Sequence, residues 1–281
     1  MLFRGILVMR SSVSILPGFR LSLGYTLTYL TILVLIPLAA CLLRAGSLSP
    51  AEFAAAAWTP RARAAYGVTF GCSLAAAAID VVLGLLLAWV LVRYDFPFRR
   101  LFDSLIDLPF ALPTAVAGLV YSNLYAPKGW LGQWLVPMGI RGAYSQLAIV
   151  LVLTFIGLPF VVRALQPVLE SLEADIEEAA ACLGATRLQT FCRVLFPALW
   201  PAMITGFALT FARGLGEYGS VVFVSGNMPF KTEIAPVLIV ARLEEFAYAE
   251  ATAIAVVLLA ISFAMLILIN WLERRSLRYA D

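Results

Sequence analysis

The chain has 281 residues, of which 62% are hydrophobic and 13% are charged, whereas about 25% of the residues in a soluble domain are charged. So little polar surface excludes a soluble globular protein. A net charge of +3 with two lysines also excludes the dense basic patch of a nucleic-acid-binding protein. The sequence has no histidine, the commonest general base and metal ligand, so we expect no metal site. The four cysteines lack CxxC spacing and are expected to be free thiols.

Long apolar runs follow one another along the chain, and a hydrocarbon core about 30 Å thick needs about 20 helical residues to cross it. A strict period-two alternation is absent, which disfavours a transmembrane β-barrel. We therefore predict an all-α polytopic membrane protein with six transmembrane helices in a single domain, residues 1–281. The six spans are expected at residues 21–43, 64–92, 108–127, 142–162, 198–225 and 251–272.

The arginines and lysines near the ends of the spans predict the orientation, because cytoplasmic loops are rich in these residues. Twelve lie on the side of the amino terminus: Arg4, Arg10, Arg20, Arg93, Arg99, Arg100, Arg163, Arg187, Arg193, Arg274, Arg275 and Arg278. Seven lie on the other side: Arg44, Arg61, Arg63, Lys128, Arg141, Lys231 and Arg242. The excess predicts that both termini are cytoplasmic. The apolar stretch 234–241 is too short to cross, so we expect an external interfacial or re-entrant helix there.

The fourth and fifth spans are separated by a polar segment, residues 166–197. Apolar residues at steps of three and four after Pro167 predict a helix with one acidic face. Gly184 is expected to end this helix in a left-handed conformation. Thr186 and Gln189 form a capping-box pattern for a second, short helix, and Pro197 leads into the fifth span. The segment is thus predicted to be a rigid elbow.

Two other interpretations of this segment are weaker. An amphipathic helix lying on the lipid headgroups is usual for such a pattern, but the negative cytoplasmic leaflet would attract basic residues rather than this acidic face. A DNA-reading helix-turn-helix is disfavoured because the second helix runs into a membrane span within a few residues.

The segment carries a motif: EAA, three residues, Gly, nine residues, a β-branched residue, any residue, an apolar residue and Pro. It is formed by Glu178, Ala179, Ala180, Gly184, Val194, Phe196 and Pro197, with Glu177 directly before it. In this motif the chain resembles the permeases of bacterial ABC importers, which more often have Ile and Leu in place of Val194 and Phe196. The resemblance implies the type I permease fold, with a cytoplasmic coupling helix that docks on an ATP-hydrolysing subunit.

Further stretches narrow the resemblance to one branch of this family. The stretches LPGFRLSLG (16–24), DLPFALPTAVAGL (107–119), PFVVRALQPVLE (159–170) and RGLGEYG (213–219) resemble the T-type permeases of sulfate and thiosulfate importers. The resemblance implies an inner-membrane heterodimer with a W-type permease subunit, two copies of an ATP-binding subunit and a periplasmic sulfate- or thiosulfate-binding protein. ATP and magnesium are then expected on the ATPase, with no cofactor bound by this chain. A molybdate or tungstate permease is the alternative within the family.

Several polar residues inside the predicted spans need an explanation, since an ionised group at mid-bilayer costs about 2.5–3.5 kcal/mol on insertion scales. Arg213 and Glu217 are expected either to form a neutralising pair or to line the anion pathway or its gate. Pro113 and Thr114 indicate a bent third span that borders the pathway or simply packs closely. Asp80 is expected to have a structural role, paired with Arg213, capping a neighbouring helix or protonated.

The chain itself is not expected to be an enzyme. The nearest imitation of a nucleotide-binding loop, GNMPFKT at 226–232, has Phe230 where glycine is required before lysine. Two further alternatives are a proton-coupled secondary transporter that uses intramembrane carboxylates such as Asp80 and Glu217, and a membrane anchor without cargo.

Overall fold

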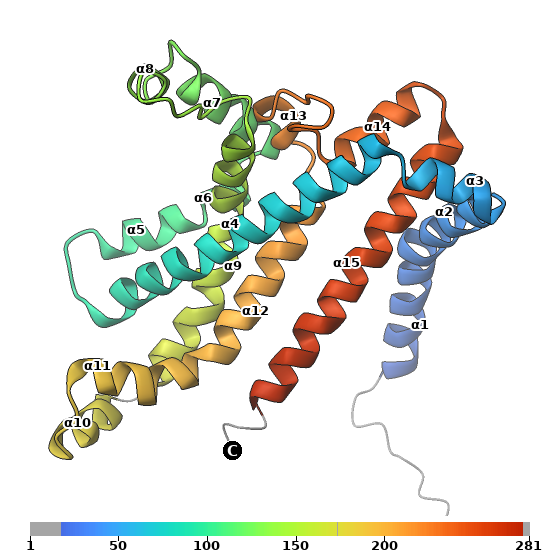
Figure 1. The fold of residues 1–281 in the computed structure, drawn as a ribbon. Helices are drawn as coiled ribbons and strands as arrows, with labels where there is room; N and C mark the ends of the chain where they lie inside the picture. Colours follow the sequence, from blue (N-terminus) through green and yellow to red (C-terminus); the bar gives the residue numbers. More distant parts are fainter. Residues whose placement is uncertain (1–17, 173, 278–281) are drawn as a thin grey trace, which may run out of the picture. The chain divides into compact units, whose positions relative to one another are not determined.

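The computed structural model describes residues 18–172 and 174–277, and every regular element within these two ranges is helical (Figure 1). The chain divides into two compact units, Met1–Ser47 and Leu48–Asp281. By length and composition, five helices of the described ranges could cross a membrane. They are Leu21–Gly46, Pro60–Arg93, Gln146–Ser171, Arg187–Leu215 and Tyr248–Trp271. Five of the six predicted spans therefore have a long helical counterpart.

The first unit is one apolar rod made of α1 (Phe19–Leu30), the π-helical turn η1 (Thr31–Leu35) and α2 (Ile36–Gly46). The π turn ends two residues before Pro37, which lacks an N–H, and the Ile36 N–H bonds to the Thr31 carbonyl five residues back. Large apolar side chains stay exposed, including Leu21 at 83% and Leu43 at 75%. A rod with so much exposed apolar surface is suited to lipid or to another membrane helix.

The second unit contains the remaining elements. They are α3 (Pro50–Ala57), α4 (Pro60–Arg93), α5 (Arg99–Ile106), α6 (Leu108–Ala111), α7 (Thr114–Tyr125), α8 (Gly132–Leu135), α9 (Gln146–Ser171), α10 (Ala174–Cys182), α11 (Arg187–Thr190), the π turn η2 (Phe191–Leu195), α12 (Phe196–Leu215), α13 (Val221–Val224), α14 (Ala235–Glu244) and α15 (Tyr248–Leu277).

The core of this unit is the bundle of α4, α9 and α12, which pack against one another over much of their length (Figure 1). Small residues allow this close approach to Val161 of α9. A Cβ at Gly84 of α4 would lie 2.6 Å from Cγ1 of Val161, and a Cβ at Gly206 of α12 would lie 2.9 Å from Cα of Val161. Val161 thus sits between two glycines at 0% exposure. Such small-residue contacts are how helices associate tightly in lipid, where the hydrophobic effect does not drive them together.

The third predicted span, 108–127, is not one helix. Leu112 and Pro113 interrupt it with extended backbone, ψ 126° and 131°, and leave α6 and α7 as separate short helices. Proline disfavours helical backbone in the residue before it, which accounts for the break at Leu112. The 12 residues of α7 extend about 18 Å, too little to cross the bilayer alone.

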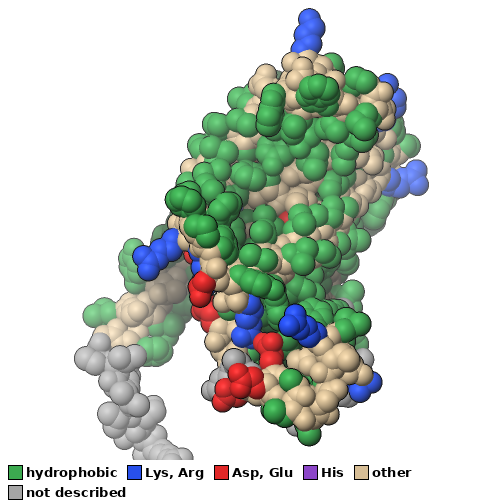
Figure 2. Space-filling view, turned by 90° about the vertical axis from the view of Figure 1, so that its left-hand side faces the viewer, with side chains coloured by type: hydrophobic (Ala, Val, Ile, Leu, Met, Phe, Trp, Pro, Cys, Tyr) green, Lys and Arg blue, Asp and Glu red, His purple; other side chains and the backbone are tan. Residues whose placement is uncertain are grey.

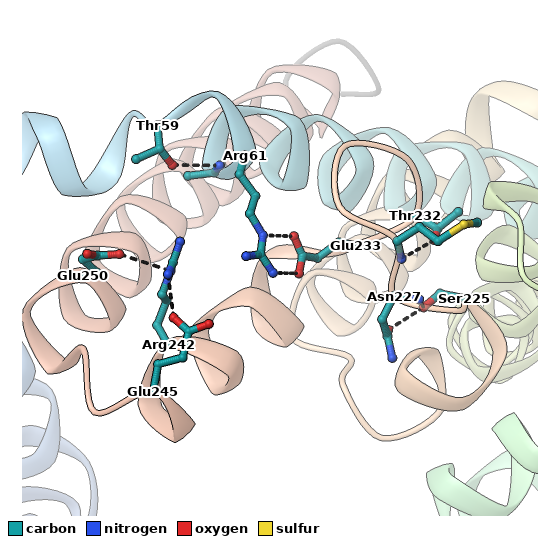
Figure 3. Close-up of polar contacts among 11 residues, drawn as sticks. Thr59, Arg61, Ser225, Asn227, Thr232, Glu233, Arg242, Glu245 and Glu250 are labelled. Carbon is teal, nitrogen blue, oxygen red and sulfur yellow. Dashed lines mark hydrogen bonds and ion pairs between the residues drawn. The ribbon is translucent and has the colours of Figure 1, made fainter.

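The predicted helix at 234–241 is confirmed as α14, and it is held at both ends (Figure 3). Before its first turn, Glu233 accepts two hydrogen bonds from Arg61 of α4, at 2.8 and 2.7 Å. In its last turn, Arg242 pairs with Glu245 and Glu250. Three helices outside the predicted spans, α3, α5 and α8, were not predicted. Ser49 and Glu52 form a capping box at the start of α3.

Candidate functional site

The predicted elbow is present, and its bend is made by α10 followed by Gly184. Gly184 has φ +81°, the left-handed conformation that glycine adopts without a steric penalty. The N–H of Ala185 bonds to the carbonyl of Ala180, and the N–H of Gly184 bonds to that of Ala181, at 3.0 and 2.9 Å. This is the Schellman arrangement, which satisfies the last carbonyls of α10. A second helix starts at once beyond it.

The second arm of the elbow begins with the predicted capping box. Thr186 accepts from the backbone N–H of Gln189, and the Gln189 side chain accepts from the N–H of Thr186. The expected short helix, however, is not separate from the fifth span: Arg187–Leu215 is one continuous helix of 29 residues. The π turn η2 lets the helix continue past Pro197, because the Phe196 N–H bonds to the Phe191 carbonyl five residues back.

The first arm also differs from the prediction, since no helix begins at Pro167. Instead α9 continues through Pro159 and Pro167 to Ser171, and α10 starts at Ala174. Leu165 and Leu169 are 0% exposed within the apolar cluster around Val161 and Leu199, so their packing stabilises helical turns on both sides of Pro167. The polar elbow is therefore shorter than the predicted segment 166–197.

The elbow exposes charged side chains of both signs together with large apolar ones. Glu178, Ala179 and Pro197 are exposed and Ala180 is half-buried. Leu183 is 89% exposed and Leu188 is 72% exposed, although both are large apolar residues on a polar segment. Figure 2 shows charged side chains gathered toward the lower part of a face that is otherwise mostly apolar. Exposed leucines beside carboxylates at the tip of a rigid bend are typical of a surface that another protein covers.

Glu177 and Glu178 are neighbours with different surroundings. Whereas Glu178 is exposed, Glu177 faces α4 and pairs with Arg93, with 2.8 Å between Nη2 and Oε1. Sequence reasoning assigned Arg93 only to the cytoplasmic charge count and missed this contact, since no local pattern links the end of α4 to the elbow.

The other predicted site residues meet at the end of α12. Glu217 lies just beyond the helix, which ends at Leu215 and not at residue 225, and still pairs with Arg213. Thr114, the first residue of α7, lies against Gly219: a Cβ added to Gly219 would meet Oγ1 of Thr114. Pro113, directly before Thr114, makes the break between α6 and α7. The short segment 216–220 therefore brings Thr114 and Glu217 to the same region of the molecule.

Asp80 does not pair with Arg213. It is 0% exposed in the core of the bundle, and neither carboxylate oxygen has a hydrogen-bond partner among the described residues. It faces Gly157 of α9, whose carbonyl accepts a hydrogen bond from Thr210 of α12 at 3.0 Å.

Within the described ranges, no group of three or more His, Cys, Asp or Glu residues is placed to hold a metal ion, and the four cysteines are free.

An apolar helical bundle with a protruding polar elbow is the arrangement expected of the permease subunits of ABC importers, and comparison with known proteins agrees. Residues 80–278 match the model of the binding-protein-dependent transport system inner membrane component family. The chain belongs to this family, and it is a multi-pass inner-membrane permease.

Individual relatives cover nearly the whole chain. The chain is 50% identical over 254 residues to the probable sulfate transport system permease protein cysT of Nephroselmis olivacea, covering 90% of this chain and 89% of the relative. It is 47% identical over 265 residues to the sulfate transport system permease protein CysT of Escherichia coli (strain K12), covering 94% and 96%.

The fold is also similar to that of a chain in the crystal structure of a bacterial alginate ABC transporter in complex with alginate pentasaccharide-bound periplasmic protein. The TM-score is 0.75 at 17% identity, with 91% of this chain and 93% of that chain covered. At this identity the likeness supports the type I importer fold alone.

Proposed function

We propose that the chain translocates sulfate and thiosulfate across the bacterial inner membrane as the permease subunit of an ATP-driven importer. The observation that carries this proposal is the 47–50% identity to sulfate transport permeases over at least nine-tenths of the chain. The regions that match include the elbow as well as the apolar helices.

The proposed complex contains this chain, a W-type permease subunit, two copies of an ATP-binding subunit and a periplasmic sulfate- or thiosulfate-binding protein. ATP and magnesium are bound by the ATPase subunits and not by this chain. The elbow is the part of this chain that docks on an ATPase, with exposed Glu178, Leu183 and Leu188 at its tip. Residues 1–281 act as one transmembrane domain with both termini in the cytoplasm, in line with the excess of arginine on that side.

The continuity of the second arm gives the proposal a mechanism. Because Arg187–Leu215 is one helix, a displacement of the elbow by a closing ATPase is passed to the far end of α12 without a flexible joint. That end carries the Arg213–Glu217 pair and contacts the start of α7 through segment 216–220. Nucleotide binding would thereby bias the permease between two arrangements of its helices.

The charge distribution fits an anionic substrate. No aspartate or glutamate occurs between Asp107 and Glu170, whereas Lys128 and Arg141 in this stretch are both exposed. Lys231, in the loop whose backbone is tied to Gln146, is exposed as well. Exposed cations in a stretch without carboxylates attract a divalent anion.

The proposal is tested by labelled sulfate uptake in cells that lack their own sulfate permeases and carry all the proposed subunits. We expect ATP-dependent uptake that thiosulfate inhibits by competition and that a protonophore leaves in place while ATP is maintained. Inhibition by molybdate or tungstate, with no effect of thiosulfate, would instead support the related oxyanion permease. Uptake that persists without the ATPase and collapses with the proton gradient would contradict an ATP-driven importer.

A further inference from the structure

The last turn of α4 holds the elbow through one arginine. Arg93, the final residue of α4, pairs with Glu177 of α10 at 2.8 Å and donates to the carbonyl of Leu172 at 3.3 Å. Its guanidinium also lies 5.7 Å from the ring centre of Trp89, one turn back on α4. One side chain thus connects the end of α4, the end of α9 and the first turn of α10.

Trp89 extends this connection to the second arm of the elbow. Its ring meets that of Phe191 edge to face, with 5.8 Å between the ring centres, and Phe191 is the first residue of the π turn η2. Between these contacts lies a hollow of about 440 Å³, lined by residues of both arms including Glu177, Ala185 and Thr190. The elbow is therefore not packed continuously against α4. Arg93 contacts its first arm and Trp89 contacts its second arm.

The helix that receives these contacts is long and uninterrupted. Between Arg61 and Arg93, α4 extends about 48 Å, and its core-facing residues Ala77 and Ala88 are 0% exposed. Near its other end, Arg61 holds Glu233 in front of α14 through two hydrogen bonds (Figure 3). An ion pair at each end thus connects α4 to the elbow and to the loop that leads into α14.

We propose that Arg93 is a positioning residue that makes α4 move with the elbow, so that two bundle helices, α4 and α12, receive the motion of the ATPase. This rests on the proposed function, in which the elbow docks on an ATPase. α12 is joined to the elbow covalently, whereas α4 contacts the elbow through Arg93 and Trp89, in addition to its packing against α9 and α12. Without the contacts of Arg93 and Trp89, the first arm of the elbow could shift relative to the end of α4, and α4 would follow the elbow only through its packing against α9 and α12.

The chemistry of the contact favours arginine over lysine. The guanidinium lies over the Trp89 ring, forms an ion pair with the Glu177 carboxylate and donates a hydrogen bond to the Leu172 carbonyl, a combination suited to the large, delocalised cation of arginine. An ammonium group would retain the charge and lose this combination of contacts. Arg93→Lys is accordingly expected to retain part of the coupling.

The test uses the complete importer in proteoliposomes and measures sulfate uptake and ATP hydrolysis in the same preparation. For Arg93→Glu we expect hydrolysis to persist while sulfate taken up per ATP falls about fivefold or more, the lower end of typical coupling effects. The reversed pair Arg93→Glu/Glu177→Arg should recover much of the lost ratio. The matched control is Arg99→Glu, because Arg99 pairs with Asp95, which is 99% exposed, and does not touch the elbow.

An unchanged uptake-to-ATP ratio in Arg93→Glu overturns the proposal, as does a reversed pair no better than Arg93→Glu alone. If Arg93→Glu fails to assemble, Glu177→Gln removes the charge at nearly constant volume, and an unchanged ratio in that variant overturns the proposal equally. A wild-type complex that hydrolyses ATP without taking up sulfate contradicts the proposed function. An active wild-type complex with unaffected variants contradicts only the role of Arg93.

Discussion

Arg213 and Glu217 form an ion pair at the end of α12, with 2.5 Å between Nη1 and Oε2. The Glu217 side chain is 2% exposed, whereas Arg213 is 35% exposed. The second carboxylate oxygen of Glu217 accepts hydrogen bonds from the backbone N–H and the hydroxyl of Ser220, at 2.9 and 3.0 Å. The pair therefore makes a buried carboxylate tolerable and fixes the segment between α12 and α13.

Loss of this arginine should weaken both assembly and uptake. Arg213→Ala leaves the buried Glu217 without its cation, and we expect a loss of about 1–3 kcal/mol in stability, since solvent at the half-exposed arginine replaces part of the interaction. Thermal unfolding of the purified complex measures this loss. The double variant Arg213→Ala/Glu217→Gln should recover stability. If its uptake also recovers, the pair is structural, and if uptake stays low, Arg213 acts on the anion. Normal stability and uptake in Arg213→Ala would contradict both roles.

The sequence was a good guide to the elbow because its features obey local rules. A glycine after an amphipathic helix and a Thr-x-x-Gln pattern each act within a few residues, and Gly184 and Thr186 have the predicted conformations. The Arg213–Glu217 pair was one of two expectations for these residues; it is present although Glu217 lies beyond the end of α12, where the helical spacing of four no longer applies.

The features that the sequence did not predict depend on packing between distant segments. α9 continues past Pro167 because Leu165 and Leu169 are buried against other helices, which outweighs the local preference for a helix start at proline. The contact of Arg93 with Glu177 is between residues far apart in the chain, and no periodicity reports it. Pro113 suggested a bend, but proline statistics alone do not distinguish a bent helix from the complete break that separates α6 and α7.

The surroundings of Asp80 predict that a negative charge on this side chain is not needed in the folded protein. It is 0% exposed, its carboxylate oxygens have no hydrogen-bond partner among the described residues, and an unpaired buried charge costs several kcal/mol. Asp80→Asn should therefore assemble and transport like the wild type, within about twofold, a change of about 0.4 kcal/mol in the barrier. Loss of sulfate uptake in a correctly assembled Asp80→Asn complex would show that the ionised carboxylate is needed.

The close approach of α9 to Asp80 makes Gly157 sensitive to any side chain. A Cβ at this position would overlap Oδ2 of Asp80 and Cγ2 of Thr210. We expect Gly157→Ala to destabilise the protein by about 1–3 kcal/mol, as overpacking of a core does. Gly71→Ala in α4, where a Cβ has open space around it, is the control, with an expected change within about 0.5 kcal/mol. Thermal unfolding in detergent compares the two, and equal stabilities would contradict the tight packing at Gly157.

The attachment of α5 to α9 should respond to pH only in acid. The side-chain amide of Gln166 and then the guanidinium of Arg163 donate hydrogen bonds to Asp103, and they hold the pKa of Asp103 below its ordinary 3.8. Because the pKa is lowered on folding, the stabilisation is complete above the ordinary value and is lost as the pH falls through the folded value.

Gln166→Met removes the larger cause, so the pKa of Asp103 should rise toward 3.8. A carboxyl-carbon NMR titration of the detergent-solubilised protein measures it, with Asp103→Asn to assign the signal. The change in stability should stay below about 1 kcal/mol, because both ion-pair partners are at least a third exposed. An unaltered titration in Gln166→Met would assign the lowered pKa to Arg163 instead.

Gly184 offers a direct test of the elbow geometry, since a side chain there changes the backbone preference without a clash inside this chain. A Cβ there meets no atom within 4 Å, yet φ is +81°. A left-handed conformation costs an ordinary residue about 1–2 kcal/mol, and a β-branched residue tolerates it least, whereas asparagine adopts it readily. We expect Gly184→Val to insert normally, to lose ATP-driven uptake and to retain less of the ATPase on co-purification. Gly184→Asn should transport at close to the wild-type rate. Equal uptake by the two variants would mean that coupling does not depend on the left-handed turn, because they differ mainly in how easily they form it.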